Sequence, residues 1–410
     1  MKDPQLLLTF HQNEQEWNNL YNKLFFSPTT QHMDSIQIQQ MNSIKSFPAF
    51  YYYTETTAYL LSDIIEQMSR LNNVVNKIPA SAIEQFQISC LIEEIQSSND
   101  IEGVHSTRRE ISEALDKQDT QEGPGKIRLW GIVNKYIKLF GNENIAFYTC
   151  DDLRKFYDDF VLDEVCRDDE KNRPDGEIFR ADGVDVHSNT KIIHKGLYPE
   201  SKIISYMEQA MQILHDTQIP ALIRISIFHY LFGYIHPFYD GNGRTSRFIT
   251  SYYLSKILNP LVGIRLSITT KKSLRAYYKL FEITDAYGNR GDLTPFITGF
   301  LRIIRKSIIR VNDLLEEKQR ELERYQELLK QIPLKDHASE MICLQLLQAA
   351  LFSADGVTLS ALESPIDKTS RTIREKILSL PEGLVLVNKT RRAHRYILNL
   401  KYFDKKCSSI

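Results

Sequence analysis

Twelve consecutive residues, His236 to Arg247 (HPFYDGNGRTSR), bring together an imidazole, a carboxylate, two glycines and two arginines. The apolar run that ends at Ile235 predicts a helix, and Pro237 discourages its continuation. The following Asp-Gly-Asn-Gly predicts a turn whose backbone N–H groups can surround an anion, because glycines permit positive φ and close backbone approach. A helix that begins near Gly243 would add its positive N-terminal end.

The charged side chains of this stretch suit the same anion. Arg244 and Arg247 lie one helical turn apart, so both can fork onto phosphate oxygens. Asp240 supplies the hard carboxylate that holds Mg²⁺ on a polyphosphate. His236 has an ordinary pKa near neutrality, which suits it to take a proton from a hydroxyl. The stretch therefore predicts a polyphosphate cradle with a general base directed at an incoming hydroxyl.

Every fixed position of the stretch resembles the signature of the Fic family, His-Pro-Phe-x-Asp-Gly-Asn-Gly-Arg-x-x-Arg. The resemblance implies a helical core with a small β-hairpin flap, and transfer of AMP from ATP to a Ser, Thr or Tyr hydroxyl of a protein. Gly243 fits AMP transfer, because the phosphotransferase branch of the family carries Lys there. Ser246 stands where Gly is common in the family.

The resemblance also implies a role for each residue of the stretch. The catalytic base is His236 and the Mg²⁺ ligand is Asp240. Phe238 anchors the loop in the core, and Tyr277-Tyr278 lies near the adenine side. The phosphates are bound at the α and β positions by Gly241, Asn242 and Gly243, at the β position by Arg244, and at the γ position by Arg247.

A second motif, Ser98-x-x-x-Glu102-Gly103, resembles the inhibitory helix of the same family. The resemblance implies that Glu102 pairs with Arg247 and occupies the place of the γ-phosphate, while Ser98 steadies Glu102 or the helix. Because the motif precedes the core, it indicates the class with an N-terminal inhibitory helix. The alternative is an ordinary helix with a capping Ser and a C-terminal Gly stop.

The periodicity of the chain predicts a mainly α protein. Residues 1–45 are polar and predict a loosely packed arm. The expected divisions are an N-terminal helical region at 1–105 with the inhibitory helix at about 90–103, a Fic catalytic core at 106–310, a linking helix at 311–332 and a winged-helix-like domain at 333–410. Within the core, Val184 and Val186, then Ile192 and Ile193, flank a turn at Ser188-Asn189 and predict a β-hairpin that matches the flap.

The C-terminal domain carries a local excess of positive charge. Residues 366–396 hold eight basic side chains against three acidic ones, an excess of five. A winged helix with a basic third helix is compatible with DNA binding. The alternative is a module that docks the target protein and has a solvated basic face.

Composition limits the classes of function. Lys+Arg 51 against Asp+Glu 52 gives a net charge of −1, which argues against a polyanion binder over the whole chain. No apolar stretch approaches about 18 residues, so we expect no membrane partner. Five scattered cysteines with no CxxC pair are typical of a reducing, cytoplasmic location.

The sequence leaves three functions open. The first is a self-restrained protein adenylyltransferase that uses ATP and Mg²⁺; its target protein is unknown and can include the enzyme itself, and a homodimer is expected by analogy with the family. The second is the reverse reaction, removal of AMP from a modified protein at the same site. The third is a DNA-binding regulator whose Fic core acts as a sensor.

Overall fold

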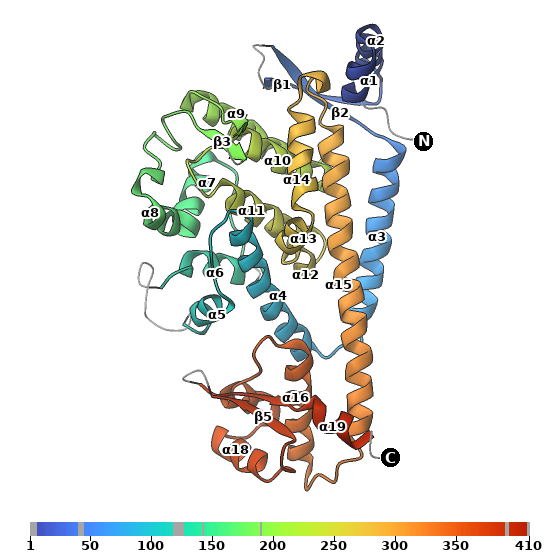
Figure 1. Ribbon diagram of the computed structural model, residues 1–410, viewed down its shortest axis with the longest axis vertical. Helices are drawn as coiled ribbons and strands as arrows, with labels where there is room; N and C mark the ends of the chain where they lie inside the picture. Colours follow the sequence, from blue (N-terminus) through green and yellow to red (C-terminus); the bar gives the residue numbers. More distant parts are fainter. Residues whose placement is uncertain are drawn as a thin grey trace. The chain divides into compact units, whose positions relative to one another are not determined.

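The computed structural model describes residues 6–39, 45–117, 127–141, 143–188, 191–389 and 393–407. The chain is mainly α-helical, and its described strands form three separate two-stranded sheets (Figure 1). It divides into two compact units, Met1–Gln67 with Ile92–Ile308, and Met68–Leu91 with Ile309–Ile410. Arg391 and Arg392, two of the basic residues of the C-terminal region, lie outside the described residues.

Three long helices contribute residues to both units: α3 (Glu55–Val75), α4 (Ala80–Ile101) and α15 (Thr294–Leu329) (Figure 1). The sequence predicted α15 as two elements, a helix at 294–310 and a linking helix at 311–332. The structure has one helix of 36 residues there, because no Gly or Pro interrupts the chain between Gly299 and Pro333.

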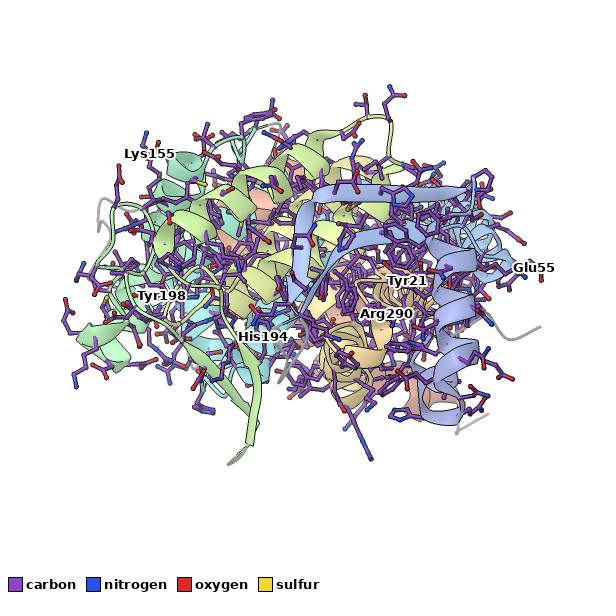
Figure 2. All side chains as sticks on the ribbon, turned by 90° about the horizontal axis from the view of Figure 1, so that it is seen from above. Tyr21, Glu55, Lys155, His194, Tyr198 and Arg290 are labelled. Atoms are coloured by element: carbon purple, nitrogen blue, oxygen red, sulfur yellow. The ribbon has the colours of Figure 1, made fainter. Side chains whose placement is uncertain are left out.

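The N-terminal segment is a folded part of the first unit, so the prediction of a loosely packed arm was wrong for residues 6–39. It forms α1 (Leu6–Gln12), α2 (Glu14–Phe25) and strand β1 (Thr30–Gln39), which pairs antiparallel with β2 (Ser46–Tyr52). Trp17 is buried and donates its indole N–H to the carbonyl of Gly288 at 2.7 Å. The guanidinium of Arg290 lies 3.4 Å from the Trp17 ring centroid and 4.9 Å from that of Tyr21, and Figure 2 shows Tyr21 and Arg290 together.

The remaining elements of the first unit form the helical core around the site. They are α5 (Arg108–Asp116), α6 (Trp130–Ile137), α7 (Cys150–Tyr157), η1 (Asp158–Leu162), α8 (Asp163–Asp168), η2 (Glu170–Asn172), β3 (Asp185–Ser188), β4 (Lys191–Lys195), α9 (Glu200–His215), α10 (Ala221–Ile235), α11 (Asn242–Ile257), α12 (Pro260–Gly263), α13 (Leu266–Lys272), α14 (Leu274–Thr284) and η3 (Tyr287–Asn289) (Figure 1).

Helix α10 is apolar all round, and twelve of its fifteen residues are buried, which marks it as a central core helix. It ends at His236, whose φ of +52° places it in the left-handed region and turns the chain away. Helix α11 begins six residues later, after Gly241 at φ +76°. The predicted hairpin is present as β3 paired antiparallel with β4, with Asp185 opposite Lys195.

The second unit contains the C-terminal elements α16 (His337–Phe352), α17 (Leu359–Ile366), α18 (Ser370–Leu378), β5 (Val385–Asn388), β6 (Arg395–Leu398) and α19 (Leu400–Cys407). Three helices followed by an antiparallel ribbon match the predicted order, and α19 was not predicted. The assignment of this part as a winged helix stays a prediction. None of the described helices combines the length and the apolar character needed to cross a membrane.

Candidate nucleotide-binding site

The loop between α10 and α11 is locked by its own side chains. Phe238 is fully buried and stacks on Tyr157 with 3.6 Å between ring centroids. The hydroxyl of Tyr157 donates to the carbonyl of Asp240 at 3.0 Å. A Cβ on Gly241 would meet the side chain of Val161 at 3.0 Å, so Gly is required there both for its φ and for its lack of a side chain.

Asn242 closes the same loop from within. Its side-chain oxygen accepts from the Phe238 N–H at 3.0 Å, and its side-chain amide donates to the Phe238 carbonyl at 2.8 Å. The side chain of Asn242 is therefore committed to the loop, and only its backbone N–H can serve the predicted anion site. Because Asn242 starts α11, that N–H has no partner within the helix.

Arg244 lies in the first turn of α11 with only 1% of its surface exposed. One guanidinium nitrogen donates to the Asp240 carboxylate at 3.3 Å. Its Nε and Nη1 groups are buried, and no partner accepts from them in the part of the chain that the structure describes. Unpaired buried donors are costly, and an anionic ligand at the N-terminus of α11 would satisfy them.

Arg247, one turn further along α11, donates from each of its three guanidinium nitrogens to the end of α4. Its Nη1 donates to the carboxylate of Glu102 at 2.7 Å, its Nε to the hydroxyl of Ser98 at 3.1 Å, and its Nη2 to the carbonyl of Ser98 at 2.9 Å. The side chain of Arg247 is 2% exposed and that of Glu102 is 25% exposed. Burial disfavours the charge of Arg247, but Glu102 outweighs this and raises the Arg247 pKa above its ordinary value.

The carboxylate of Glu102 lies directly over the start of α11. A Cβ on Gly243 would come within 2.1 Å of the nearer Glu102 oxygen and within 2.8 Å of Arg247 Nη1. The predicted inhibitory pair thus occupies the space beside the glycine turn. The predicted alternative, a Gly stop, is also present: Gly103 has φ +72°, and the Val104 N–H donates to the Asn99 carbonyl at 3.0 Å in a Schellman-type helix end.

His236 is only partly exposed at the end of α10. Burial, together with the positive charges of His194 and Arg180, lowers the pKa of His236 to about 3. The prediction of a pKa near neutrality was therefore wrong. The ring is neutral at physiological pH and can accept a proton, but it is a weaker base than an ordinary histidine.

Asp240 is the one carboxylate of the loop that could bind a metal ion. Among the described residues, no group of three or more His, Cys, Asp or Glu side chains is placed to hold an ion. Asp240 is 36% exposed and keeps its hydrogen bond to Arg244. This fits Mg²⁺, which usually takes one or two protein carboxylates and completes its octahedron with phosphate oxygens and waters.

The structure also brings in residues that the sequence did not single out. His229 of α10 is buried between the hydroxyls of Thr250 and Tyr277, with both contacts at 2.8 Å. Burial and the charge of Arg247 lower the pKa of His229 to about 3, so this ring is neutral. Tyr277 is thereby held in place and buried, and Tyr278 is exposed; their place beside the nucleotide stays a prediction. Ser246 donates to the carbonyl of Gly243 at 3.2 Å.

Comparison with known proteins shows which family and which relatives this part of the chain resembles. Residues 148–254 match the model of the Fic/DOC family. A protein of Nematostella vectensis named "Protein adenylyltransferase Fic" is 35% identical over 97 residues, which cover 24% of this chain and 19% of that protein. The protein of the same name from Drosophila yakuba is 30% identical over 95 residues, 23% of this chain and 17% of that protein. The chain thus spans about a fifth of the length of the curated relatives it matches.

A solved structure resembles a larger part of the fold. The crystal structure of a Fic family protein from Desulfovibrio desulfuricans aligns with a TM-score of 0.53 and 19% identity, and the alignment covers 85% of this chain and 98% of that one. At this identity the likeness shows the fold alone. The match over residues 148–254 shows that this part of the chain is a Fic domain.

Proposed function

We propose that the protein transfers AMP from ATP to a Ser, Thr or Tyr hydroxyl of a protein target. The observation that carries the proposal is the buried Nε and Nη1 of Arg244, in the first turn of α11, for which the described residues supply no acceptor. Two relatives over this region are named adenylyltransferases, which supports ATP as the donor. Gly243, in place of a lysine, has no side chain that would block an α-phosphate once Glu102 has moved away.

The transfer would use the residues of the loop in order. The backbone N–H groups of Asn242 and Gly243 and the guanidinium of Arg244 bind the phosphates and orient the α-phosphorus. The Gly241 N–H donates to the Asp240 carboxylate at 2.5 Å and would join them only by leaving that partner. His236 takes the proton of the target hydroxyl as that oxygen bonds to the α-phosphorus. The bond from the α-phosphorus to the bridging oxygen breaks, and pyrophosphate leaves with that oxygen. Asp240 would hold Mg²⁺, which neutralises phosphate charge when bound.

We further propose that Glu102 restrains the enzyme. The γ-phosphate of ATP and the Glu102 carboxylate compete for Arg247, and the carboxylate also occupies the space where a Cβ on residue 243 would stand. With Glu102 in place, a triphosphate can bind only with its γ-phosphate displaced and its α-phosphate out of line with an incoming hydroxyl.

The test is the mass of the purified protein, and of a proteome extract, after incubation with ATP and Mg²⁺. The Glu102→Gly variant should gain the mass of AMP and take label from α-labelled ATP but not from γ-labelled ATP. The wild type should gain much less, and Glu102→Gly/His236→Ala should gain none. A Glu102→Gly variant that binds ATP yet labels nothing, in itself or in the extract, would sink the proposal.

The reverse reaction has its own supporting observation. Within the described residues the carboxylate of Glu102 has Arg247 as its only partner and is a quarter exposed, so it can also orient a water. Incubation of an AMP-modified protein with the wild type and with Glu102→Gly separates the two reactions. Release of AMP that is lost on Glu102→Gly identifies the hydrolase, and release that is unchanged or absent identifies the transferase.

A further inference from the structure

Four consecutive carbonyls, the last two of α10 and the two that follow it, accept hydrogen bonds from the segment that carries the hairpin. The last carbonyls of a helix have no partner within the helix and need external donors. The carbonyl of Tyr234 faces Nε2 of His194 at 2.7 Å, and that of Ile235 accepts from the Leu197 N–H at 3.1 Å. Two more donors come from Arg180: its Nε reaches the carbonyl of His236 at 2.9 Å, and its backbone N–H reaches that of Pro237 at 3.3 Å.

Arg180 also ties together the two ends of the hairpin. Its Nη1 donates to the carbonyl of Asp182, before β3, and its Nη2 donates to the carbonyl of Leu197, after β4, at 2.8 Å. One planar guanidinium thus joins the segment that enters the hairpin, the segment that leaves it, and the backbone of His236. Arg180 is fully buried, and burial lowers its pKa from the ordinary value.

The guanidinium of Arg180 is closely packed against the backbone of Gly196. A Cβ on Gly196 would lie 2.5 Å from Nη2 of Arg180, 2.8 Å from the side chain of Val184 and 3.1 Å from the Cβ of His236. The base of the hairpin therefore touches both Arg180 and His236. Figure 2 labels His194, which lies on β4, and Tyr198, which lies in the segment that follows β4.

A role in stability alone does not account for this arrangement. In the part of the chain that the structure describes, no carboxylate lies within ion-pair distance of Arg180, and all its side-chain acceptors are neutral carbonyls. A buried cation without a counter-ion is costly, and an apolar side chain of similar volume would avoid that cost. What an apolar side chain cannot supply is a rigid fork that fixes three carbonyls relative to one another.

We propose that Arg180 is a positioning residue that holds the base His236 and the two ends of the β3–β4 hairpin as one hydrogen-bonded unit. The position of the imidazole relative to the hairpin is then set by the three hydrogen bonds of the Arg180 guanidinium. This inference rests on the proposed transfer reaction for its kinetic consequence, but the structural coupling itself does not depend on that reaction.

The kinetic test compares Arg180→Lys and Arg180→Met in the active Glu102→Gly background. Lys keeps the charge but loses the fork, whereas Met loses both. Because a displacement of about 1 Å can cost roughly 10²-fold in rate, both variants should lose about 10²-fold in kcat while the KM and Kd for ATP stay within about twofold. The matched control is Arg224→Met, which removes a guanidinium that also donates to backbone carbonyls, those of Asp216 and Ile219, away from the site. It should keep the parent kcat.

Hydrogen exchange measures the coupling without any catalytic readout. Arg180→Lys should speed amide exchange in the peptides that contain Leu197 and His236, and Arg224→Met should leave both peptides unchanged. This arm decides the inference even if Glu102→Gly proves inactive, which would defeat the proposed function alone. If Arg180→Met does not fold, Gly196→Ala replaces it, since its added Cβ displaces the fork without removing any donor. Unchanged kcat and exchange, or a parallel loss of ATP affinity, would overturn the inference.

Discussion

Replacing Glu102 with Ala should tighten ATP binding by about 10- to 100-fold. To reach Arg247, the γ-phosphate must displace the Glu102 carboxylate, which a 2.7 Å charge-assisted hydrogen bond holds there; otherwise ATP binds without this contact. Such a bond has a net worth of about 1.5–3 kcal/mol, and about 1.4 kcal/mol corresponds to a tenfold change in Kd. Because the Arg247 side chain is 2% exposed and that of Glu102 only 25%, screening by solvent reduces this free energy only slightly.

The same substitution should lower the free energy of unfolding of the protein by about 1–3 kcal/mol, because Arg247 keeps its bonds to Ser98 but loses its counter-charge. Titration calorimetry with ATP and Mg²⁺ measures the Kd, and chemical denaturation measures the stability. The control is Glu84→Gln, which removes an exposed carboxylate from the same helix and should change neither quantity. A folded Ala variant with the wild-type Kd would falsify the competition between Glu102 and the γ-phosphate.

Three further predictions concern the stability and titration of the site. Burial raises the pKa of Glu94 on α4 from 4.5 to about 6, so its contribution to stability is complete below about pH 4.5 and is lost as the pH rises through 6. Across this pH window the free energy of unfolding of the wild type should fall by about 2 kcal/mol more than that of Glu94→Gln, as measured by denaturation at several pH values. Parallel plots of unfolding free energy against pH for the two proteins would contradict this. Tyr157→Phe removes the hydrogen bond to the Asp240 carbonyl and should cost about 0.5–1.5 kcal/mol in thermal unfolding; an unchanged melting temperature would show that this bond contributes nothing. A bound polyphosphate should raise the pKa of His236, measured by NMR titration of Glu102→Gly with and without a non-hydrolysable ATP analogue; identical titration curves would mean that the ring does not face the phosphates.

The site loop was predictable because its chemistry is local in sequence. From His236 to Arg247 the helix stop, the glycine turn and the two arginines follow one another, so their spacing alone brings them together. The pairing of Glu102 with Arg247 joins residues 145 positions apart, and it came from the resemblance of two motifs and not from any physical pattern in the chain.

The pKa of His236 and the role of Arg180 could not be predicted in this way. Both depend on which atoms surround a group in space, and a single arginine in an irregular segment has no periodic signal. The positive charges that lower the pKa of His236 come from positions 180 and 194, outside the motif.

The prediction of a loosely packed N-terminal arm failed for a different reason. Its Gln- and Asn-rich composition suggested exposure, yet β1 buries Met33, Ile36 and Ile38 while most of its polar residues are exposed. A bulge between Met33 and Gln37 breaks the simple alternation of a strand, which hides the pattern.

The position of Glu102 at the very tip of α4 determines how little has to move for ATP to gain Arg247. Terminal turns are the least costly part of any helix to unwind. Glu94, two turns earlier, is anchored separately by the N–H of Ser267 at 2.8 Å. Unwinding of the residues around Ile101 to Gly103 would therefore release Arg247 from Glu102 while the rest of α4 stays in place. The restraint can then be lifted by local fraying of the helix end, without movement of the whole helix.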